Sequence, residues 1–229
     1  MINNNIQIYT ITDIPRDCAT NIALDEVFFI KEDFIPIIRF YRWTKPAYTI
    51  GYFQKISELD NKNNYDVVRR LTGGLAVLHN TDLSYSFIVS DEQWNYIYNQ
   101  EETYKIIHTQ MKDSLKDIGI ICDNKQADNL TPNKFSCVNT FYKDDIFFKG
   151  KKLIGSCQRR RGKRILIEGS IHLKMNEEQI NDFTASFFER ISSFLNGTIY
   201  KTKLEQKYIN EADILSKNKY NNDKWTNLF

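Results

Sequence analysis

One stretch of the chain concentrates residue types that could bind a ligand. It runs from Arg69 to His79 with the sequence Arg-Arg-Leu-Thr-Gly-Gly-Leu-Ala-Val-Leu-His, and an alternating segment follows from Leu83 to Ser90. Glycines permit positive φ and a close approach of the backbone to a ligand. Exposed N–H groups in such a turn, beside two cations, favour an anionic or carbonyl-rich group. A second interpretation stays open, because Gly-Gly is also an ordinary hairpin turn and Arg-Arg is often a solvated sheet edge.

The composition excludes several classes of protein. The 229 residues, 41% hydrophobic and 14% aromatic, predict a single domain over residues 1–229 with a sizeable core. A net charge of +2 does not indicate a nucleic-acid partner. Because the sequence lacks a run of about 18 apolar residues and a signal-peptide pattern, we expect no membrane span. The four cysteines lack metal-ligand spacing and are typical of thiols in a reducing, cytoplasmic compartment.

Hydrophobic periodicity predicts interleaved strands and helices. Strands are expected at residues 6–11, 36–43, 48–53, 120–122, 145–148, 152–160 and 164–173, and helices at 18–31, 95–119, 176–195 and 203–216. The second helix should bury Tyr104 and expose His108, and the polar tail from Lys217 is expected to be mobile. Since hairpins outnumber βαβ units, the predicted fold class is α+β, with mixed, largely antiparallel sheets flanked by helices.

Five motifs occur in an informative order. They are Asn21–Glu26, Tyr41–Trp43 followed by Ile50–Gln54, Arg69–His79, Lys151–Arg159 and Gly169–Ile171. Together they resemble the catalytic domain shared by lipoate–protein ligases, octanoyltransferases and biotin–protein ligases. The resemblance covers about residues 6–195 and implies the class II biotin/lipoyl synthetase-like fold. Residues 196–229 would add a C-terminal helix and a polar tail, without the accessory domain of some ligases.

The resemblance implies a chemistry for this set of residues. A medium acyl chain would lie in an apolar tunnel under the glycine turn, with its carbonyl against the side chain of Lys152. An ammonium at that point polarises the carbonyl and stabilises a developing oxyanion. The implied substrate-binding residues are Arg70, Thr72, Gly73, Gly74, Ala76, His79, Gly155 and Ser156. His79 has two interpretations, as a group that orients the acyl carbonyl or the cysteine, or as a hydrogen-bonded histidine at a strand end.

The family contains two mechanisms, and Cys137 favours one of them. The segment Phe135–Val138 resembles the cysteine segment of the octanoyltransferase branch, and Leu75 stands where ligases have a third glycine. A thiolate close to Lys152 would have a lowered pKa and would serve as a nucleophile. Cys157 stands where the family usually has alanine and is interpreted as core packing. The resemblance thus implies Cys137 and Lys152 as the catalytic residues.

The sequence therefore predicts an octanoyltransferase that acts through an acyl-Cys137 intermediate. It would move an octanoyl or lipoyl group from acyl carrier protein to a lipoyl-domain lysine, in the glycine-cleavage H protein or a 2-oxoacid dehydrogenase E2, with no cofactor and no metal. One alternative is a lipoate–protein ligase that uses ATP and Mg to form lipoyl-AMP, and another is a non-catalytic paralogue that binds lipoyl domains. The basic cluster Arg159–Arg164 either docks acidic carrier domains or is a solvated turn.

Overall fold

The computed structural model describes residues 6–32, 34–59, 64–123 and 142–229. Its strands are β1 (Ile6–Thr12), β2 (Ile37–Tyr41), β3 (Ala47–Ile50), β4 (Asp66–Arg69), β5 (Val77–His79), β6 (Leu83–Ser90), β7 (Ile146–Phe148), β8 (Lys151–Arg161), β9 (Arg164–Ile171) and β10 (Gly197–Lys201). Its α-helices are α1 (Cys18–Ile30), α2 (Gln100–Asp117), α3 (Glu177–Leu195), α4 (Gln206–Leu215) and α5 (Asp223–Thr226). Short 3-10 turns lie at Ile56–Glu58 and Asn95–Tyr98, and a π-helical turn lies at Ser216–Tyr220.

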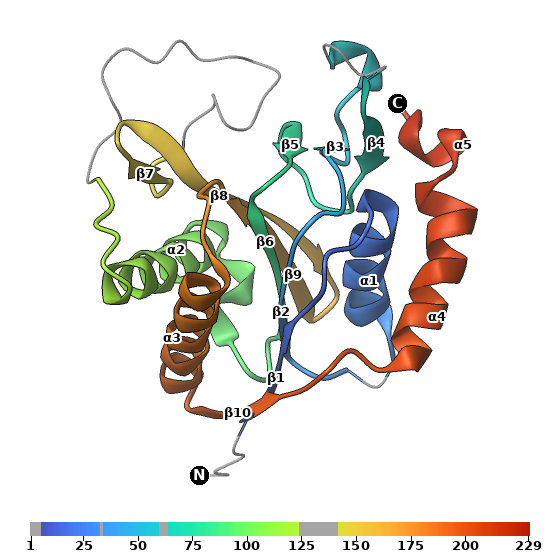
Figure 1. Cartoon of the computed structure of the whole chain (residues 1–229). Coiled ribbons are helices and arrows are strands. Elements are labelled where there is room, and N and C mark those ends of the chain that lie inside the picture. The colour runs from blue at the N-terminus through green and yellow to red at the C-terminus, as the bar shows by residue number, and fades with distance from the viewer. Residues whose placement is uncertain (1–5, 33, 60–63, 124–141) are drawn as a thin grey trace.

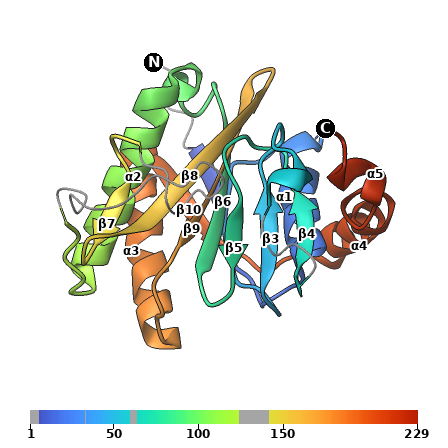
Figure 2. The same cartoon turned by 90° about the horizontal axis from the view of Figure 1, so that it is seen from above.

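The strands form a large sheet and a small one. The large sheet has the order β10-β1-β2-β6-β9-β8-β7, in which β10, β1 and β2 are parallel and each later pair is antiparallel. The small sheet has the order β4-β3-β5. Helices α2 and α3 cover one face of the large sheet, while α1, α4 and the small sheet lie on its other side (Figures 1 and 2). The predicted α+β class with mixed, largely antiparallel sheets is confirmed.

The core lies on both faces of the large sheet. Strand β6 is buried along its whole length because helices cover one face and α1 the other. On the α2–α3 side, the ring of Phe40 packs edge-on against Phe183 and Phe187 of α3. Edge-to-face packing of this kind stabilises a core beyond the area it buries. Helix α3 begins as its sequence predicts, with Asn176 and Gln179 forming a reciprocal capping box.

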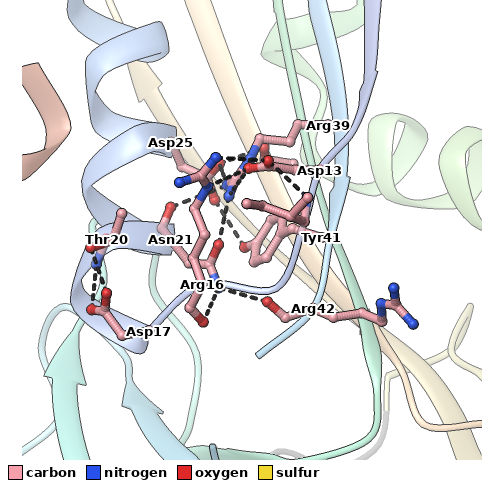
Figure 3. A network of polar contacts seen from close by, with 11 residues as sticks. Asp13, Arg16, Asp17, Thr20, Asn21, Asp25, Arg39, Tyr41 and Arg42 are labelled. Atoms are coloured by element: carbon pink, nitrogen blue, oxygen red, sulfur yellow. Dashed lines mark hydrogen bonds and ion pairs between the residues drawn. The ribbon is translucent and has the colours of Figure 1, made fainter. Parts of the chain in front are cut away.

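A buried ionic network fixes α1 to the sheet. Arg39 of β2 is completely buried, and its guanidinium binds Oδ2 of Asp13 at 3.0 Å and Oδ1 of Asp25 at 3.0 Å. Figure 3 shows Arg39 between these two carboxylates, with Asn21 of α1 beside them. Because each charge is paired, their burial is tolerated, and removing one partner would leave an uncompensated buried charge. The network therefore sets the position of α1, whose Ile22 reaches the cavity described below.

Several predictions about individual segments are wrong. Residues 120–122 form no strand, although Asp123 makes an isolated bridge to Phe147. The tail from Lys217 is packed rather than mobile, because its aromatic residues have partners. Tyr220 is 1% exposed, and Trp225 Nε1 donates to the carbonyl of Arg69 at 2.8 Å.

Of the helices in the described ranges, none is long and apolar enough to cross a membrane.

Candidate active site

A cavity of about 570 Å³ lies between the loop that follows β4 and strands β8 and β9. This size is typical of a pocket for a small organic ligand. Predicted site residues that line it are Arg70, Gly73, Gly74, His79, Lys152, Gly155 and Ser156. The other two, Thr72 and Ala76, are buried in the protein, with exposed fractions of 0% and 2%. The catalytic prediction for Cys137 falls outside the described residues.

The loop with the two glycines is not a hairpin turn. Strands β4 and β5 lie on opposite sides of β3, so the chain crosses over the end of β3 between them. Arg70 holds this crossing in shape. Its guanidinium donates to the carbonyls of Gly73 at 2.7 Å, Leu75 at 2.9 Å and Thr49 at 3.1 Å. The interpretation of Arg-Arg as a solvated edge is therefore wrong, because both arginines are buried.

Arg69 also fixes the backbone around the loop between β4 and β5, which we call the glycine loop. Its guanidinium donates to the carbonyls of Gly51, Tyr52 and Gln54, and to those of Trp225 and Thr226 in the C-terminal segment. Saturating a buried guanidinium with carbonyl oxygens fixes the backbone segments that supply them. The C-terminal segment is thus part of the support of the glycine loop.

Gly51 and Gly74 allow the glycine loop to lie directly against the backbone that follows β3. A Cβ on Gly51 would lie 1.8 Å from the carbonyl oxygen of Gly74, so any larger residue at position 51 would displace the loop. Gly74 itself has φ of 88°, a conformation that side chains other than glycine rarely adopt. Glycine is therefore required at both positions for a physical reason.

The most informative group in the cavity wall is the side chain of Lys152. It lies on β8, and its Nζ is 2.7 Å from Oδ2 of Asp145, with side-chain exposed fractions of 2% and 0%. Asp145 also accepts a hydrogen bond from the phenol of Tyr104 and one of 2.8 Å from the backbone N–H of Tyr142. A buried ammonium that is paired in this way is held in one position in the cavity wall.

A second polar chain lies beside the first one. His108 of α2 is 2% exposed, which contradicts the prediction of a surface residue. Its Nδ1 is 2.7 Å from the carbonyl of Asp144 and must donate, so Nε2 accepts from the hydroxyl of Ser156 at 2.5 Å. The phenol of Tyr85 also bonds to Ser156. Burial lowers the pKa of His108 to about 4 and keeps the ring neutral.

His79 has the geometry of a hydrogen-bonded histidine at a strand end, and it also lines the cavity. Its Nδ1 is 2.8 Å from Oδ2 of Asp82, its Nε2 is 2.9 Å from the hydroxyl of Thr49, and its ring stacks on Trp43. Burial alone would raise the pKa of Asp82, but the His79 ring holds that pKa well below its ordinary value. Both ring nitrogens are thus engaged within the protein.

Cys157 lies in the cavity wall as well, and its interpretation as core packing is wrong. The residue is partly exposed and lines the cavity at the glycine loop. Its Sγ is 3.0 Å from the hydroxyl of Thr72, which in turn donates to the carboxylate of Glu168. Glu168 of β9 also lines the cavity.

Sequence reasoning missed four residues of this site, namely Tyr104, His108, Asp145 and Glu168. Tyr104 and His108 are four positions apart on α2, so they share one face of the helix, and their rings lie 4.0 Å apart. That spacing is a signal that could have placed His108 beside Tyr104, which is partly buried rather than fully buried as predicted. For Asp145 and Glu168 no local pattern indicates a site, because their partners come from distant segments.

The comparisons with known proteins agree with this geometry. The family description "Lipoyl protein ligase A/B catalytic domain" matches residues 17–196. Octanoyltransferase LipM of Oceanobacillus iheyensis is 35% identical over 178 residues, 73% of this chain and 64% of that protein. Octanoyltransferase LipM of Bacillus subtilis is 32% identical over 211 residues, 83% of this chain and 76% of that protein. The chain thus spans just under two thirds of the first relative's length.

Solved structures show the same fold at lower identity. A putative lipoate protein ligase from Thermoplasma acidophilum superposes with a TM-score of 0.74 at 21% identity, covering 98% of this chain and 99% of the other. A lipoate-protein ligase A structure bound with ATP has a TM-score of 0.73 at 20% identity, with 97% and 98% covered.

Fold and site together define an α+β catalytic domain with a buried lysine in a ligand cavity. The chain belongs to the lipoyl protein ligase A/B catalytic domain family. The resemblance inferred from the motifs is confirmed, and the names of the similar sequences agree with the octanoyltransferase branch.

Proposed function

We propose that this protein is an octanoyltransferase of protein lipoylation, which takes an octanoyl group from a thioester and places it on a lysine of a lipoyl domain. The observation that carries this proposal is the buried pair of Lys152 and Asp145 in the wall of a cavity beside the glycine loop. The names of the similar sequences support the octanoyl group and the transfer reaction.

In the proposed reaction the acyl chain occupies the cavity and its carbonyl oxygen meets Lys152. The thiolate of Cys137 attacks the carbonyl carbon, the Cys137 S–C bond forms, and the bond to the donor's thiol breaks. The Lys152 ammonium stabilises the charge that develops on the carbonyl oxygen. The lysine amine of the acceptor then attacks the acyl-Cys137 carbonyl, an amide forms, and a proton passes to the released thiolate. The role of Cys137 rests on the resemblance of its segment to that branch.

The proposed partners are acyl carrier protein as donor and a lipoyl-domain protein as acceptor, such as the glycine-cleavage H protein or a 2-oxoacid dehydrogenase E2, in the cytoplasm. A structurally similar lipoate protein ligase from Thermoplasma acidophilum is described with its E2 lipoyl domain. In this chain Arg161 and Lys163 at the tip of the β8–β9 hairpin are exposed, whereas Arg160 and Arg164 bind backbone carbonyls. The exposed pair supplies positive charge for an acidic carrier domain.

The direct test is intact-mass spectrometry after incubation with octanoyl-acyl carrier protein without ATP. The wild type should gain one octanoyl group that peptide mapping places on Cys137, and Cys137→Ser should not acquire it there. Product formed only with free acid, ATP and Mg would instead establish the competing assignment as a lipoate–protein ligase. Absence of product under both conditions, with retained binding of a lipoyl domain, would establish a non-catalytic paralogue.

A further inference from the structure

A second thiol lies in the cavity, and the residues around it form a continuous hydrogen-bonded chain. Cys157 is on β8, Thr72 is on the glycine loop, and Glu168 is on β9 opposite Cys157 in the sheet register. The Thr72 hydroxyl donates its one proton to the Glu168 carboxylate. With that proton committed, the Thr72 oxygen accepts from the thiol of Cys157, whose Sγ is 3.0 Å away and also lies 3.5 Å from the backbone carbonyl oxygen of Glu168.

Glu168 has the properties of a proton acceptor at the end of this chain. It is 5% exposed and lines the cavity, and its second oxygen, Oε1, has no hydrogen-bond partner among the described residues. A buried carboxylate oxygen without a partner is costly, which favours uptake of a proton there. Burial raises the pKa of Glu168 to about 7, and Asp25 adds to the increase.

Other charged and titratable groups, on several elements, interact with Glu168. Asp25 and Glu26 of α1 raise its pKa, while Arg70 and the hydrogen bond from Thr72 lower it. The phenols of Tyr41 and Tyr220 also lie within electrostatic range, and their own pKa values are raised well above the ordinary range, chiefly by burial. Glu168 is thus the acidic group of this set that lies at the end of the Thr72 hydrogen bond and titrates close to neutral pH.

We propose that Cys157 is a second acyl-accepting thiol of the cavity and that Thr72 passes its proton to Glu168. The inference rests on the proposed function for its acyl donor. As the thiol proton moves to the Thr72 oxygen, the Thr72 proton moves to the Glu168 carboxylate. The Cys157 thiolate attacks the thioester carbonyl carbon, the new S–C bond forms, and the bond to the donor thiol breaks. The leaving thiolate recovers the proton from Glu168, so atoms and charge balance.

The first test measures the reactivity of the thiol without any acyl donor. Iodoacetamide labels the folded protein between pH 5 and 9, and peptide mapping gives a separate rate for each cysteine. Cys157 should react at least tenfold faster at pH 7.5 than the buried references Cys18 and Cys122. Its rate should rise with an apparent pKa near 7, and in Glu168→Gln and Thr72→Val that midpoint should move toward about 8.5, the ordinary thiol value.

The second test uses an octanoyl thioester of a small thiol, S-octanoyl-N-acetylcysteamine, with the Cys137→Ser variant. Peptide mapping should find one octanoyl group on Cys157, formed at least tenfold more slowly when Glu168→Gln is added. Acylation of Cys137 alone in the wild type would overturn this inference and leave the proposed function standing. Acylation at neither thiol would overturn both. Two results would overturn the proton path alone. One is a labelling rate at Cys157 equal to that at Cys18, and the other is a pH midpoint for Cys157 that is unchanged in Glu168→Gln and Thr72→Val.

Discussion

The ammonium of Lys152 lies 2.7 Å from the carboxylate of Asp145, and solvent reaches almost none of either side chain. Removing one partner of a buried pair leaves a buried charge without compensation, at a cost of about 3–5 kcal/mol. Lys152→Met and Asp145→Asn should therefore each lower the free energy of unfolding by an amount of this order.

The double variant separates stability from chemistry. Lys152→Met with Asp145→Asn should be more stable than the sum of the single effects predicts, because no buried charge remains. Octanoyl transfer should stay about 10²–10³-fold below the wild-type rate, since the group that stabilises the oxyanion is gone. Lys45 and Asp66, an exposed pair, provide the control, and Asp66→Asn should have little effect on unfolding. Recovery of transfer in the double variant would contradict the assigned role of Lys152.

The contact between Gly51 and the glycine loop predicts a difference between two alanine substitutions. In Gly51→Ala the new methyl group would meet the Gly74 carbonyl, whereas a Cβ on Gly73 has no atom within 4 Å. We expect Gly51→Ala to lower the free energy of unfolding, measured in urea, by about 1–3 kcal/mol, because overpacked sites lose stability of this order. Gly73→Ala should lower it much less. Equal stability of the two variants would show that the loop is not held against Gly51.

His108 should make the protein less stable in mild acid. Its pKa is lowered from 6.5 to about 4, so between these values the unfolded chain binds a proton that the native ring does not. Its contribution is thus present above pH 6.5 and is lost as the pH falls toward 4. The free energy of unfolding, measured from pH 4 to 7, should fall less steeply on acidification in His108→Gln. Parallel curves for the two proteins would contradict a buried neutral ring.

Glu168 should have the opposite effect to His108 on how the free energy of unfolding depends on pH. Its pKa rises from 4.5 to about 7 on folding, so the native state keeps a proton that the unfolded state has released. Stability should therefore decrease as the pH rises from 4.5 through 7, by an amount on the order of 3 kcal/mol. Glu168→Gln, which stays neutral, should remove this decrease, while the exposed Glu178→Gln should keep it. If Glu168→Gln follows the wild-type curve, the carboxyl is not protonated in the native protein.

Local patterns in the sequence were sufficient for most of the fold. The helix at residues 176–195 and the strands of the β8–β9 hairpin are encoded within a few residues, and each formed close to its predicted bounds. The order of the motifs was sufficient to identify the family and to place Lys152 in the wall of a cavity. Local patterns failed where a partner is distant, as for His108, whose burial depends on Ser156.

The prediction of a mobile tail from Lys217 was wrong for a related reason. Tyr220 and Trp225 are isolated aromatic residues in a polar segment, so no periodic pattern indicates a buried face. Their packing depends on hydrogen bonds to Glu26 and Arg69, which are distant in the sequence. The role of Glu168 could not be predicted for the same reason, since α1, the glycine loop and β8 together form the environment of its carboxyl group. Such contacts become visible only when the whole chain is folded.

Transfer of the octanoyl group from its carrier to a lipoyl domain, followed by mass spectrometry without ATP, tests the central claim most directly. The account predicts that the lipoyl-domain lysine gains one octanoyl group, that added ATP does not change the rate, and that Lys152→Met/Asp145→Asn lowers the rate about 10²–10³-fold. A lipoyl domain that stays unmodified until free octanoate, ATP and Mg are supplied would contradict it.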